Sequence, residues 1–350
     1  MRHDHPHVRT TSGLGVALVL AALVLASCSH PATVAPRPPH VAGTPALSIS
    51  VPLSTVGCTL NDVCVAVGTS SGGATPSAVA EFSTPKGRWL DLLLPAAHSP
   101  LIDALACSGS QCLLGGSQPG QDLLWLFTAT GHLVSATVAP TGGIGVDALT
   151  CDLANCALVD TGASGAPPRF VESGDGGMSW DTPAPLDFAV GDAVTTLACG
   201  TVEDCAIGVV SASHTFYLYV TDDAGATWVL QSTPSAWTTL TSLSCAKRRC
   251  VALAQIADGS TLVRTTTFTR TWKTVALASQ ASSLSCTPTA TCLVAGTRTG
   301  GSPWLAIVRK RVVTDVRLRY VPTPLVGAAC GSKVCAAIGV TTVLSLTSGL

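Results

Sequence analysis

Short apolar segments alternate with turn-forming residues along most of the chain. A segment with an apolar residue two positions before a cysteine recurs seven times, and a second apolar segment follows a nearby cysteine, as in CVAVG (64–68) and CAAIG (335–339). After a loop rich in Gly, Ser and Pro comes a third segment such as TFYLYV (215–220), then a tight turn and a fourth such as TWVLQ (227–231). Segments of this length, separated by turn signals, predict antiparallel β-strands in units of four.

Fourteen of the fifteen cysteines lie in seven close pairs. The first members of successive pairs are 49, 44, 48, 46, 41 and 44 residues apart, a period that suits one four-stranded propeller blade. We therefore expect an all-β fold, a seven-bladed β-propeller of four-stranded antiparallel blades. Four or five residues separate the cysteines of a pair, which favours one hairpin disulfide per blade over paired zinc-binding thiols. The pairs are Cys58 with Cys64, Cys107 with Cys112, Cys151 with Cys156, Cys199 with Cys205, Cys245 with Cys250, Cys286 with Cys292 and Cys330 with Cys335.

The two ends of the chain predict how the ring closes. After Cys335 the sequence supplies a second strand and a third, VLSL (343–346). The segment ALSISVP (46–52) matches the pattern of VRLRYVP (316–322), the predicted fourth strand of the preceding blade. We expect the N-terminal strand to complete the last blade, because this closure leaves no open seam in the ring.

The N-terminal residues carry an export signal. Two arginines precede an apolar run, Leu14–Ala26, which is too short to span a bilayer as a helix, and this pattern predicts a signal peptide over residues 1–27. The run ends in Leu25-Ala26-Ser27-Cys28, which resembles the lipobox of bacterial lipoproteins. The resemblance implies that Cys28 is lipidated and anchors the mature protein to the outside of the bacterial cell membrane. An ordinary secretory signal cleaved nearby is the alternative.

A tether and one domain are expected after the signal. Residues 28–45 are rich in proline and have no apolar periodicity, so they predict a stiff, extended tether. The cysteine period runs through residues 46–350, which we expect to form the propeller. An exported chain lies in a compartment where disulfides persist.

Two predicted turns between third and fourth strands share the pattern S/T-x-D-x-G-x-S/T-W, which resembles the Asp-box repeat of sialidases and related propellers. A short carboxylate accepts bonds from turn amides, glycine allows positive φ, and tryptophan packs between blades, so the motif predicts a structural role. A ring with this motif is also similar to the photosystem II assembly factors. The motif residues are Ser173, Asp175, Gly177 and Trp180 in one turn and Thr221, Asp223, Gly225 and Trp228 in the other.

Sialidase chemistry does not follow from this resemblance. Those enzymes use three arginines, a tyrosine nucleophile paired with glutamate, and an acidic proton donor, whereas this chain has three tyrosines and three glutamates at positions that do not suit a central site. We expect no catalytic residues, no cofactor and no metal. A sialidase-like glycoside hydrolase acting on envelope or host glycans is the alternative.

Polar residues stand four positions before the first cysteine in six of the seven repeats, where the inner strand enters the ring. A ring of hydroxyls with two carboxylates suits a sugar or a cation, and the alternative is that these groups bond to each other and to strand ends. This candidate ligand ring comprises Ser54, Asp103, Asp147, Thr195, Thr241 and Ser282.

The net charge of −1 hides a strong asymmetry. Residues 46–240 hold 17 acidic against 3 basic side chains, whereas residues 241–350 hold 2 against 13, so the two parts carry −14 and +11. Screening over about 8 Å does not cancel charges across a propeller. The basic residues gather in hairpins and turns expected on one face, a candidate anion-binding patch of Lys247, Arg248, Arg249, Arg270, Arg309, Lys310 and Arg311. A solvated surface without a ligand is the alternative.

These features together favour a cell-envelope lipoprotein that acts as a non-catalytic binding or assembly scaffold through one propeller face. The expected partners are the membrane, through the lipid anchor, and an anionic lipid or envelope polymer, a glycan or a protein. Nucleic acid is not expected as a partner of an exported protein. A purely structural envelope protein is a further possibility.

Overall fold

The computed structural model describes part of the chain within one compact unit, Pro38–Leu350. The predicted signal peptide, the tether and Cys28 lie outside the described residues. The described residues are 47–48, 52–70, 77–83, 89–92, 101–118, 121–142, 145–160, 166–189, 191–233, 237–256, 261–267, 273–289, 291–309, 312–318 and 321–347.

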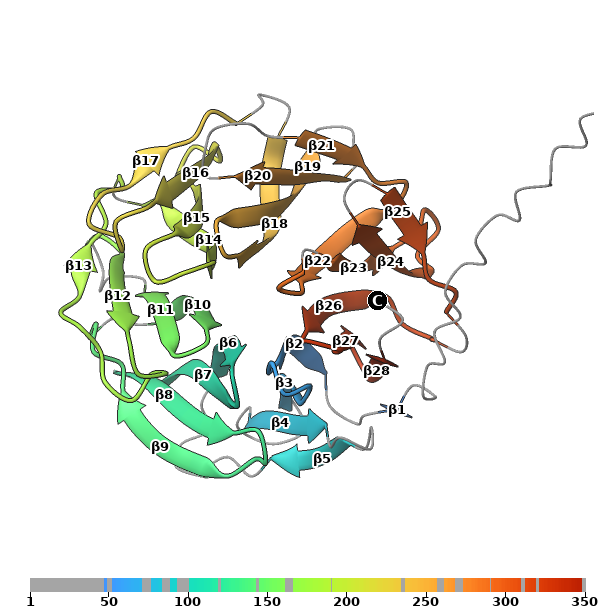
Figure 1. The fold of residues 1–350 in the computed structure, drawn as a ribbon, viewed down its shortest axis with the longest axis horizontal. Coiled ribbons are helices and arrows are strands. Elements are labelled where there is room, and N and C mark those ends of the chain that lie inside the picture. The colour runs from blue at the N-terminus through green and yellow to red at the C-terminus, as the bar shows by residue number, and fades with distance from the viewer. Residues whose placement is uncertain are drawn as a thin grey trace, which may run out of the picture. The chain divides into compact units, whose positions relative to one another are not determined.

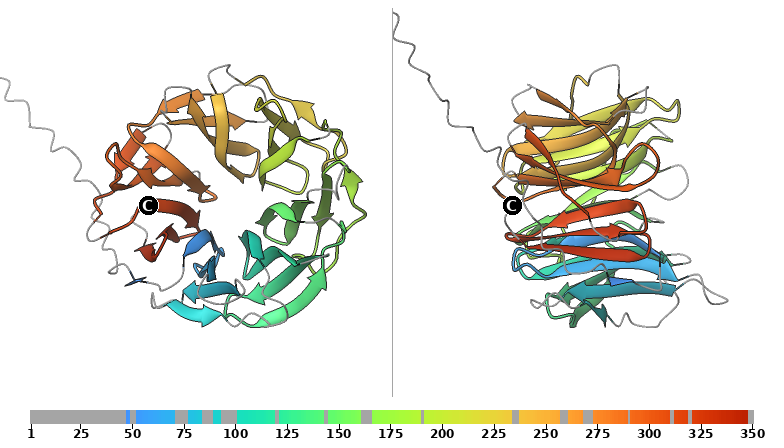
Figure 2. Two further views of the ribbon diagram at one scale, coloured as in Figure 1. Left: turned by 180° about the vertical axis from the view of Figure 1, so that it is seen from behind. Right: turned by 90° about the vertical axis from the view of Figure 1, so that its right-hand side faces the viewer.

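The strands of this unit form seven four-stranded antiparallel sheets arranged in a ring (Figures 1 and 2). We number the sheets 1 to 7 by their inner strands in chain order. The inner strands are β2 (Leu53–Cys58), β6 (Leu101–Ser108), β10 (Val146–Asp152), β14 (Ala193–Cys199), β18 (Trp237–Ala246), β22 (Gln280–Cys286) and β26 (Leu325–Cys330). The second strands are β3 (Cys64–Ser70), β7 (Gln111–Gln118), β11 (Asn155–Asp160), β15 (Cys205–Val210), β19 (Arg249–Ile256), β23 (Thr291–Thr297) and β27 (Val334–Gly339).

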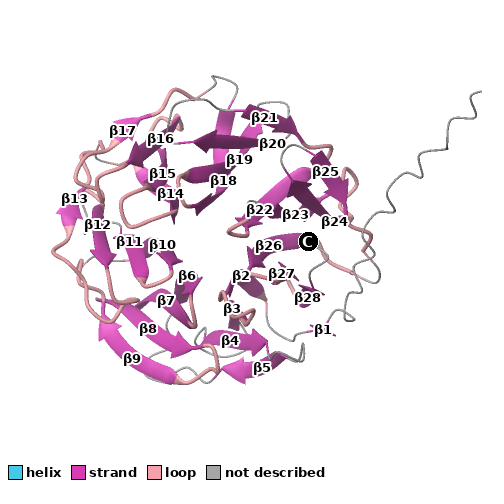
Figure 3. Cartoon of the chain, in the orientation of Figure 1, coloured by secondary structure: helices cyan, strands magenta, loops and turns pink. Residues whose placement is uncertain are grey.

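The outer strands follow in the same order. The third strands are β4 (Ser77–Ser83), β8 (Gln121–Thr128), β12 (Arg169–Ser173), β16 (Phe216–Thr221), β20 (Thr261–Thr267), β24 (Pro303–Arg309) and β28 (Thr342–Thr347). The fourth strands are β5 (Trp89–Leu92), β9 (Leu133–Val138), β13 (Ala184–Pro185), β17 (Val229–Leu230), β21 (Lys273–Ala276), β25 (Val312–Asp315) and β1 (Leu47–Ser48). The described segments are strands and loops (Figure 3), and none of them is a helix that could span a membrane. The predicted all-β propeller of antiparallel sheets is confirmed.

The chain closes the ring with its N-terminal strand, as predicted. Strand β1 pairs with β28, with Leu47 opposite Val343 and Ser48 opposite Thr342. The Leu53 N–H also donates to the carbonyl of Val340 at 2.8 Å. Sheet 7 therefore contains strands from both ends of the described chain, which ties the last sheet to the first.

A disulfide joins the first and second strands of every sheet, so the predicted hairpin pairing is confirmed. The two cysteines of a bond face each other in the strand ladder, as Cys58 faces Cys64 in sheet 1. The bonds are Cys58–Cys64, Cys107–Cys112, Cys151–Cys156, Cys199–Cys205, Cys245–Cys250, Cys286–Cys292 and Cys330–Cys335. All fourteen paired cysteines of the sequence are thus accounted for.

The turn between third and fourth strands emerges on the same side of the ring as the cysteine hairpins. Successive antiparallel strands reverse direction, so every second connection lies on the same side. We call this side the cysteine face and the other side the opposite face.

Buried apolar side chains form seven clusters, one at each junction between neighbouring sheets. At the junction of sheets 3 and 4, for example, Val159 and Phe170 pack with Leu197 and Ile207. Burying such side chains favours folding by about 1.5 to 3 kcal/mol each. The ring is held together by packing between sheets as well as by hydrogen bonds within them.

Candidate binding cavity on the cysteine face

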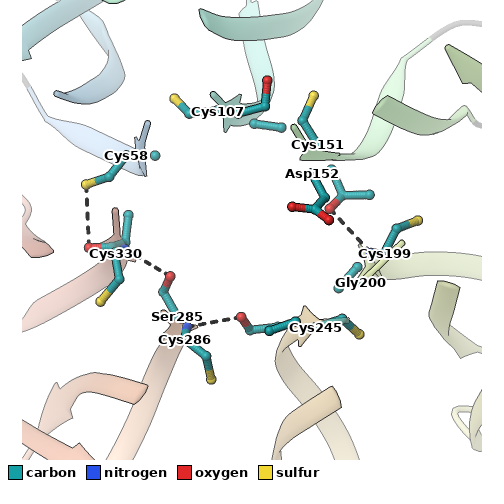
Figure 4. Close-up of a pocket in the computed structure, with 18 of the residues that line it drawn as sticks. Cys58, Cys107, Cys151, Asp152, Cys199, Gly200, Cys245, Ser285, Cys286 and Cys330 are labelled. Atoms are coloured by element: carbon teal, nitrogen blue, oxygen red, sulfur yellow. Dashed lines mark hydrogen bonds between the residues drawn. The ribbon is translucent and has the colours of Figure 1, made fainter. Parts of the chain in front are cut away.

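A central cavity of about 480 Å³ lies between the seven cysteine hairpins (Figure 4). Every inner strand lines it with the same three positions, which are the first cysteine and the two residues before it. The position farthest from the hairpin forms an apolar layer of Val56, Leu105, Leu149, Leu197, Leu243, Leu284 and Ala328. These are the apolar residues whose sevenfold recurrence marks the repeat in the sequence.

The second cysteine of each pair lies in the core and does not line the cavity. Each of these residues is at most 3% exposed, and each belongs to a different apolar cluster between sheets. They are Cys64, Cys112, Cys156, Cys205, Cys250, Cys292 and Cys335. The pairing predicted from the sequence treats the two cysteines alike, but the structure gives them different surroundings. The first cysteine borders the cavity and also contacts the apolar clusters, whereas the second packs between neighbouring sheets without bordering the cavity.

Hydroxyl groups bridge neighbouring inner strands around this cavity. The backbone N–H of Cys286 donates to Ser244 Oγ at 3.0 Å, and the N–H of Cys330 donates to Ser285 Oγ at 3.0 Å (Figure 4). Thr150 Oγ1 accepts the N–H of Cys199 at 3.4 Å. An inner strand is a sheet edge, and its free N–H groups need acceptors when they are partly buried. In sheets 3, 5 and 6 the residue before the first cysteine supplies that acceptor to the next sheet.

Asp152 and Lys247 are the charged residues that line the cavity. Asp152 directly follows Cys151, and Figure 4 shows its carboxylate turned toward the middle of the ring of cysteines. Burial raises the pKa of this carboxyl group. The cavity therefore combines an apolar wall with one acidic and one basic group at its rim.

Lys247 reaches the cavity because two hairpins are in close contact. Lys247 adopts a left-handed conformation with φ of 53°, and its carbonyl oxygen would lie 1.8 Å from a Cβ at Gly200. Only glycine fits this position, since any side chain would meet the backbone of the neighbouring hairpin. Arg248 Nε lies 3.4 Å from Asp204 Oδ2, with Arg248 71% exposed and Asp204 5% exposed. The basic hairpin of sheet 5 is thus seated on the hairpin of sheet 4.

The candidate anion-binding patch is placed in part. Lys247, Arg248 and Arg249 are exposed in the hairpin between β18 and β19, and Arg309 is exposed at the end of β24 beside the turn to β25. All four residues belong to the cysteine face. Arg270, Lys310 and Arg311 lie outside the described residues.

The residues of the candidate ligand ring lie on the opposite face, and each of them is at a β-bulge that the sequence did not predict. In every inner strand the residue four positions before the first cysteine is skipped in the ladder, which is a β-bulge. The bulged residues are Ser54, Asp103, Asp147, Thr195, Thr241, Ser282 and Val326. A bulge at one position in all seven sheets makes this polar ring a regular part of the repeat.

Four hydroxyls of this ring bond to the backbone of neighbouring strands. Thr195 Oγ1 and Thr241 Oγ1 each donate at 3.2 Å, to the carbonyls of Gly208 and Leu253. Ser54 Oγ donates to the Val67 carbonyl at 3.3 Å. Ser282 Oγ lies within bonding distance of the carbonyls of Ala295 at 3.2 Å and Leu325 at 2.8 Å. These contacts match the alternative in which the hydroxyls satisfy strand ends.

The two aspartates of the ring differ from the hydroxyls. Burial raises the pKa of Asp103, and a hydrogen bond from Ser117 partly opposes the rise. Asp103 belongs to sheet 2 and Asp147 to sheet 3, so both stand at the same side of the ring. They mark an acidic part of the opposite face.

The two S/T-x-D-x-G-x-S/T-W turns have the same internal hydrogen bonds. Asp175 Oδ1 accepts from Ser173 Oγ and from the Ser179 N–H, both at 2.8 Å. Asp223 Oδ1 accepts from Thr221 Oγ1 at 2.7 Å and from the Thr227 N–H at 2.8 Å. These bonds lower the pKa of both carboxyl groups, that of Asp175 to about 2. The carboxylates are engaged inside their own turns.

The same turns pack against the preceding sheet. The Trp228 ring meets Phe170 of sheet 3 edge to face with centroids 5.3 Å apart, and Trp180 packs in the cluster between sheets 2 and 3. Gly225 has φ of 76°, and a Cβ there would lie 2.3 Å from the Phe170 ring. Gly177 has φ of 93° beside Leu113 of sheet 2. The motif residues thus join neighbouring sheets.

The described tyrosines and glutamates do not line the cavity. Tyr217 and Tyr219 belong to β16, a third strand, and Tyr219 packs on Phe188 with ring centroids 4.7 Å apart. Glu172 lies in β12, where burial and the charge of Asp181 raise its pKa to about 7. Within the described ranges no group of three or more His, Cys, Asp and Glu side chains has the arrangement of a metal centre.

Two features of the site were missed from the sequence. Asp152 is the one acidic residue that directly follows a first cysteine, and aligning those seven positions would have singled it out. The bridging hydroxyls of Thr150, Ser244 and Ser285 share the position before the first cysteine, but their partners lie about one repeat further along the chain. That contact depends on how neighbouring sheets sit together.

Comparisons with known proteins identify the fold alone. No protein-family model and no curated protein matches the chain. Among solved structures, the chain is similar to YCF48 bound to D1 peptide, with a TM-score of 0.61, 14% identity and coverage of 89% of this chain and 99% of that one. It is similar to catalytically inactive virginiamycin B lyase from Staphylococcus aureus with quinupristin, with a TM-score of 0.62, 7% identity and coverage of 87% and 98%.

A third similar structure is the GH74 xyloglucanase from Xanthomonas campestris, with a TM-score of 0.58 and 12% identity. The match covers 87% of this chain and 53% of the xyloglucanase chain. The neighbours thus include propellers with a bound peptide or small molecule and a glycoside hydrolase. The class of protein is a β-propeller, and the comparisons add no activity to it.

Proposed function

We propose that this chain is an exported, lipid-anchored, seven-bladed propeller that acts as a non-catalytic binding scaffold at the bacterial cell envelope. Export and anchoring are supported by the Leu25-Ala26-Ser27-Cys28 motif and by the seven disulfides, which need an oxidising compartment. Each of the seven sheets serves as one blade of the closed ring.

The cysteine face is the proposed contact surface for an anionic partner. The observation that carries this proposal is that Lys247 lines the central cavity while Arg248 and Arg249 extend the same hairpin into solvent. Arg309 adds a further positive charge on this face. An anionic lipid headgroup or envelope polymer is attracted to clustered cations by about 1 kcal/mol per basic residue near the surface.

Vesicle binding tests this proposal. A Cys28→Ala form avoids lipidation, so that the anchor does not dominate, and its co-sedimentation is compared between vesicles with and without anionic lipid. The Arg248→Ser/Arg249→Ser double variant is expected to lose about thirtyfold in affinity for anionic vesicles, which corresponds to about 1 kcal/mol for each arginine. A soluble anionic polymer tested in parallel distinguishes a polymer partner from a lipid surface.

The matched control removes two arginines from the opposite face of the propeller. Arg298→Ser/Arg317→Ser changes the net charge equally, and in each double variant one arginine is ion-paired, Arg248 with Asp204 and Arg298 with Asp315. The control is expected to bind like the parent. Equal loss in the two variants, or loss that does not depend on salt, would contradict a specific contact through the cysteine face.

A glycoside hydrolase is the second candidate, favoured by one observation. The pKa of Glu172 is raised to about 7 beside Asp181, and a carboxylic acid that stays protonated near neutral pH is what glycoside hydrolysis needs as proton donor. Glu172 lies in a third strand away from the cavity, so scaffold binding remains the first proposal. Hydrolysis of envelope or host glycans that disappears in Glu172→Gln would favour the enzyme instead.

A further inference from the structure

Two aspartates are buried near each other between sheets 2 and 3 on the opposite face. Asp122 is the second residue of β8 and is 1% exposed, and Asp160 is the last residue of β11 and is 0% exposed. Both stand at strand ends that point away from the cysteine face. The charge of Asp160 acts on Asp122 across the junction of the two sheets.

The side-chain oxygens of Asp122 and Thr141 lack hydrogen-bond donors within the described part of the chain. Neither carboxylate oxygen of Asp122 accepts a hydrogen bond there, and the hydroxyl of Thr141, which is 1% exposed, has no partner either. The Gly145 N–H lies near enough to Asp122 to lower its pKa but does not reach hydrogen-bond geometry. Asp175 by contrast is surrounded by donors from its own turn. Buried polar atoms of a native protein normally have partners, so these oxygens point to a ligand.

Residues 139–142, the described start of the connection from sheet 2 to sheet 3, are hydrogen-bonded to both sheets. This connection begins where the Ala139 N–H donates to the Asp122 carbonyl at 3.0 Å, and it carries Thr141. Arg169 Nη1 donates to the carbonyl of Thr141 at 2.7 Å. Arg169 faces Asp160 in the ladder between β11 and β12, so this contact brings Thr141 beside the Asp160 strand end. The hydroxyl and the two carboxylates thus come from adjoining parts of one junction.

The charge balance of this junction is negative. Burial is the main cause of the raised pKa of Asp122, and the charges of Asp160 and Asp103 add to it. Asp147 stands on the neighbouring bulge, and Asp147 and Asp160 each interact with another group. Arg169 Nη1 donates to the Thr141 carbonyl. Like charges buried together are unfavourable unless a cation or a proton compensates them.

We propose that Asp122, Asp160 and Thr141 form a binding site for one hard cation, Ca²⁺, that joins sheets 2 and 3. The side-chain atoms that would bind the ion are all oxygens, which Ca²⁺ prefers as ligands. Backbone carbonyls and waters complete the coordination of Ca²⁺ in flexible geometry. The site has only two carboxylates, so it is not one of the clusters of three or more His, Cys, Asp and Glu side chains that are absent from the described residues. The inference departs from the metal-free expectation of the sequence, and it does not depend on the proposed function of the cysteine face.

A thermal shift experiment tests the site with Ca²⁺ itself. The full-length protein with its disulfides intact is stripped with a chelator and titrated with Ca²⁺ at neutral pH. The melting temperature of the wild type is expected to rise by about 3 °C or more at saturation, because an ion that binds only the folded state stabilises it. Mg²⁺ is expected to give a smaller rise, since it demands stricter octahedral geometry.

Variants separate this site from other acidic groups. Asp122→Asn is expected to abolish the response to Ca²⁺ and to melt at the same or a higher temperature than the wild type in chelator, because it removes like-charge repulsion. Thr141→Val keeps both carboxylates and is expected to weaken Ca²⁺ binding about tenfold through the loss of one hydrogen-bonding or ligating oxygen. Asp181→Asn removes an exposed acid on the cysteine face and is expected to keep the full response.

Calorimetric titration with Ca²⁺ gives the stoichiometry, expected to be one ion per chain. A wild type whose melting temperature is insensitive to Ca²⁺, but rises as the pH falls, would show that a shared proton compensates the carboxylates and would overturn the proposal. An unchanged Ca²⁺ response in both Asp122→Asn and Thr141→Val would overturn it as well.

Discussion

Asp62 Oδ1 accepts the backbone N–H of Lys333 at 2.6 Å, across the junction where the first and last sheets meet. The same oxygen accepts the Val334 N–H at 2.9 Å, and Ser332 Oγ donates to the Leu60 carbonyl at 2.7 Å. A Cβ at Gly331 would lie 2.3 Å from the Thr59 carbonyl oxygen, so the two hairpins are in close contact. One carboxylate from the start of the ring thus fixes the hairpin at its end.

Loss of this carboxylate is expected to weaken ring closure. Asp62→Ala removes the acceptor of two backbone N–H groups and places alanine at φ of 63°, so the free energy of unfolding is expected to fall by about 2 to 3 kcal/mol. Denaturant unfolding measures the change. Asp62→Asn, which tolerates the conformation and keeps one oxygen, is expected to lose about 1 kcal/mol; equal losses in the two variants would argue against this role.

Glu172 is expected to make stability fall as the pH rises. Its pKa of about 7 in the folded protein exceeds the ordinary value of 4.5, so the folded state binds the proton more tightly and loses that advantage between about pH 4.5 and pH 7. Glu172→Gln should be more stable than the wild type at pH 8 by about 1 to 2 kcal/mol and nearly equal at about pH 4. Thermal melts across this range measure the difference in stability between Glu172→Gln and the wild type. A difference that does not change with pH would show that the pKa of Glu172 is not raised.

Asp175 is expected to act in the opposite direction. Its pKa is lowered to about 2 by bonds from Ser179 and Ser173, so its contribution is present above about pH 4 and is lost as the pH falls toward 2. Solvent screening at this exposed turn limits the contribution to about 1 kcal/mol. Asp175→Asn should therefore lower the melting temperature at about pH 6 but have little effect at about pH 2. A constant difference at the two pH values would assign the loss to geometry instead of charge.

Gly200 is expected to control the position of the basic hairpin. A methyl group at residue 200 meets the Lys247 carbonyl oxygen at 1.8 Å, so Gly200→Ala must push the hairpin of sheet 5 away and should cost about 2 kcal/mol or more of unfolding free energy. Binding to anionic vesicles should weaken in parallel. Gly109→Ala, in the hairpin of sheet 2, meets nothing within 4 Å and serves as the control. Normal vesicle binding by a folded Gly200→Ala protein would show that membrane contact does not depend on the position of this hairpin.

The repeat could be predicted from the sequence because its signals are local. Cys58 and Cys64 lie six residues apart, so spacing alone pairs them, and the bonds of Asp175 join residues of one turn. The closure of the ring by β1 was also predictable, since residues 46–52 match the pattern of a fourth strand at residues 316–322.

Contacts between repeats could not be predicted in the same way. Asp62 and Lys333 are separated by 271 positions, and the residues around each of them do not predict this contact. The polar residues at Ser54 and Thr195 were recognised in the sequence, but a polar side chain does not show that its residue is a bulge in the ladder. Burial of Asp122 and Asp160 depends on the packing of two sheets, which composition does not encode.

The short reach of each disulfide has a consequence for biogenesis. Because the bonded cysteines are only five or six residues apart, each bond of the proposed exported protein can form once its own hairpin has emerged, before later cysteines compete for the same partners. We therefore expect oxidation in order of emergence to favour the native pairs, whereas β1 must wait for β28 at the far end of the chain.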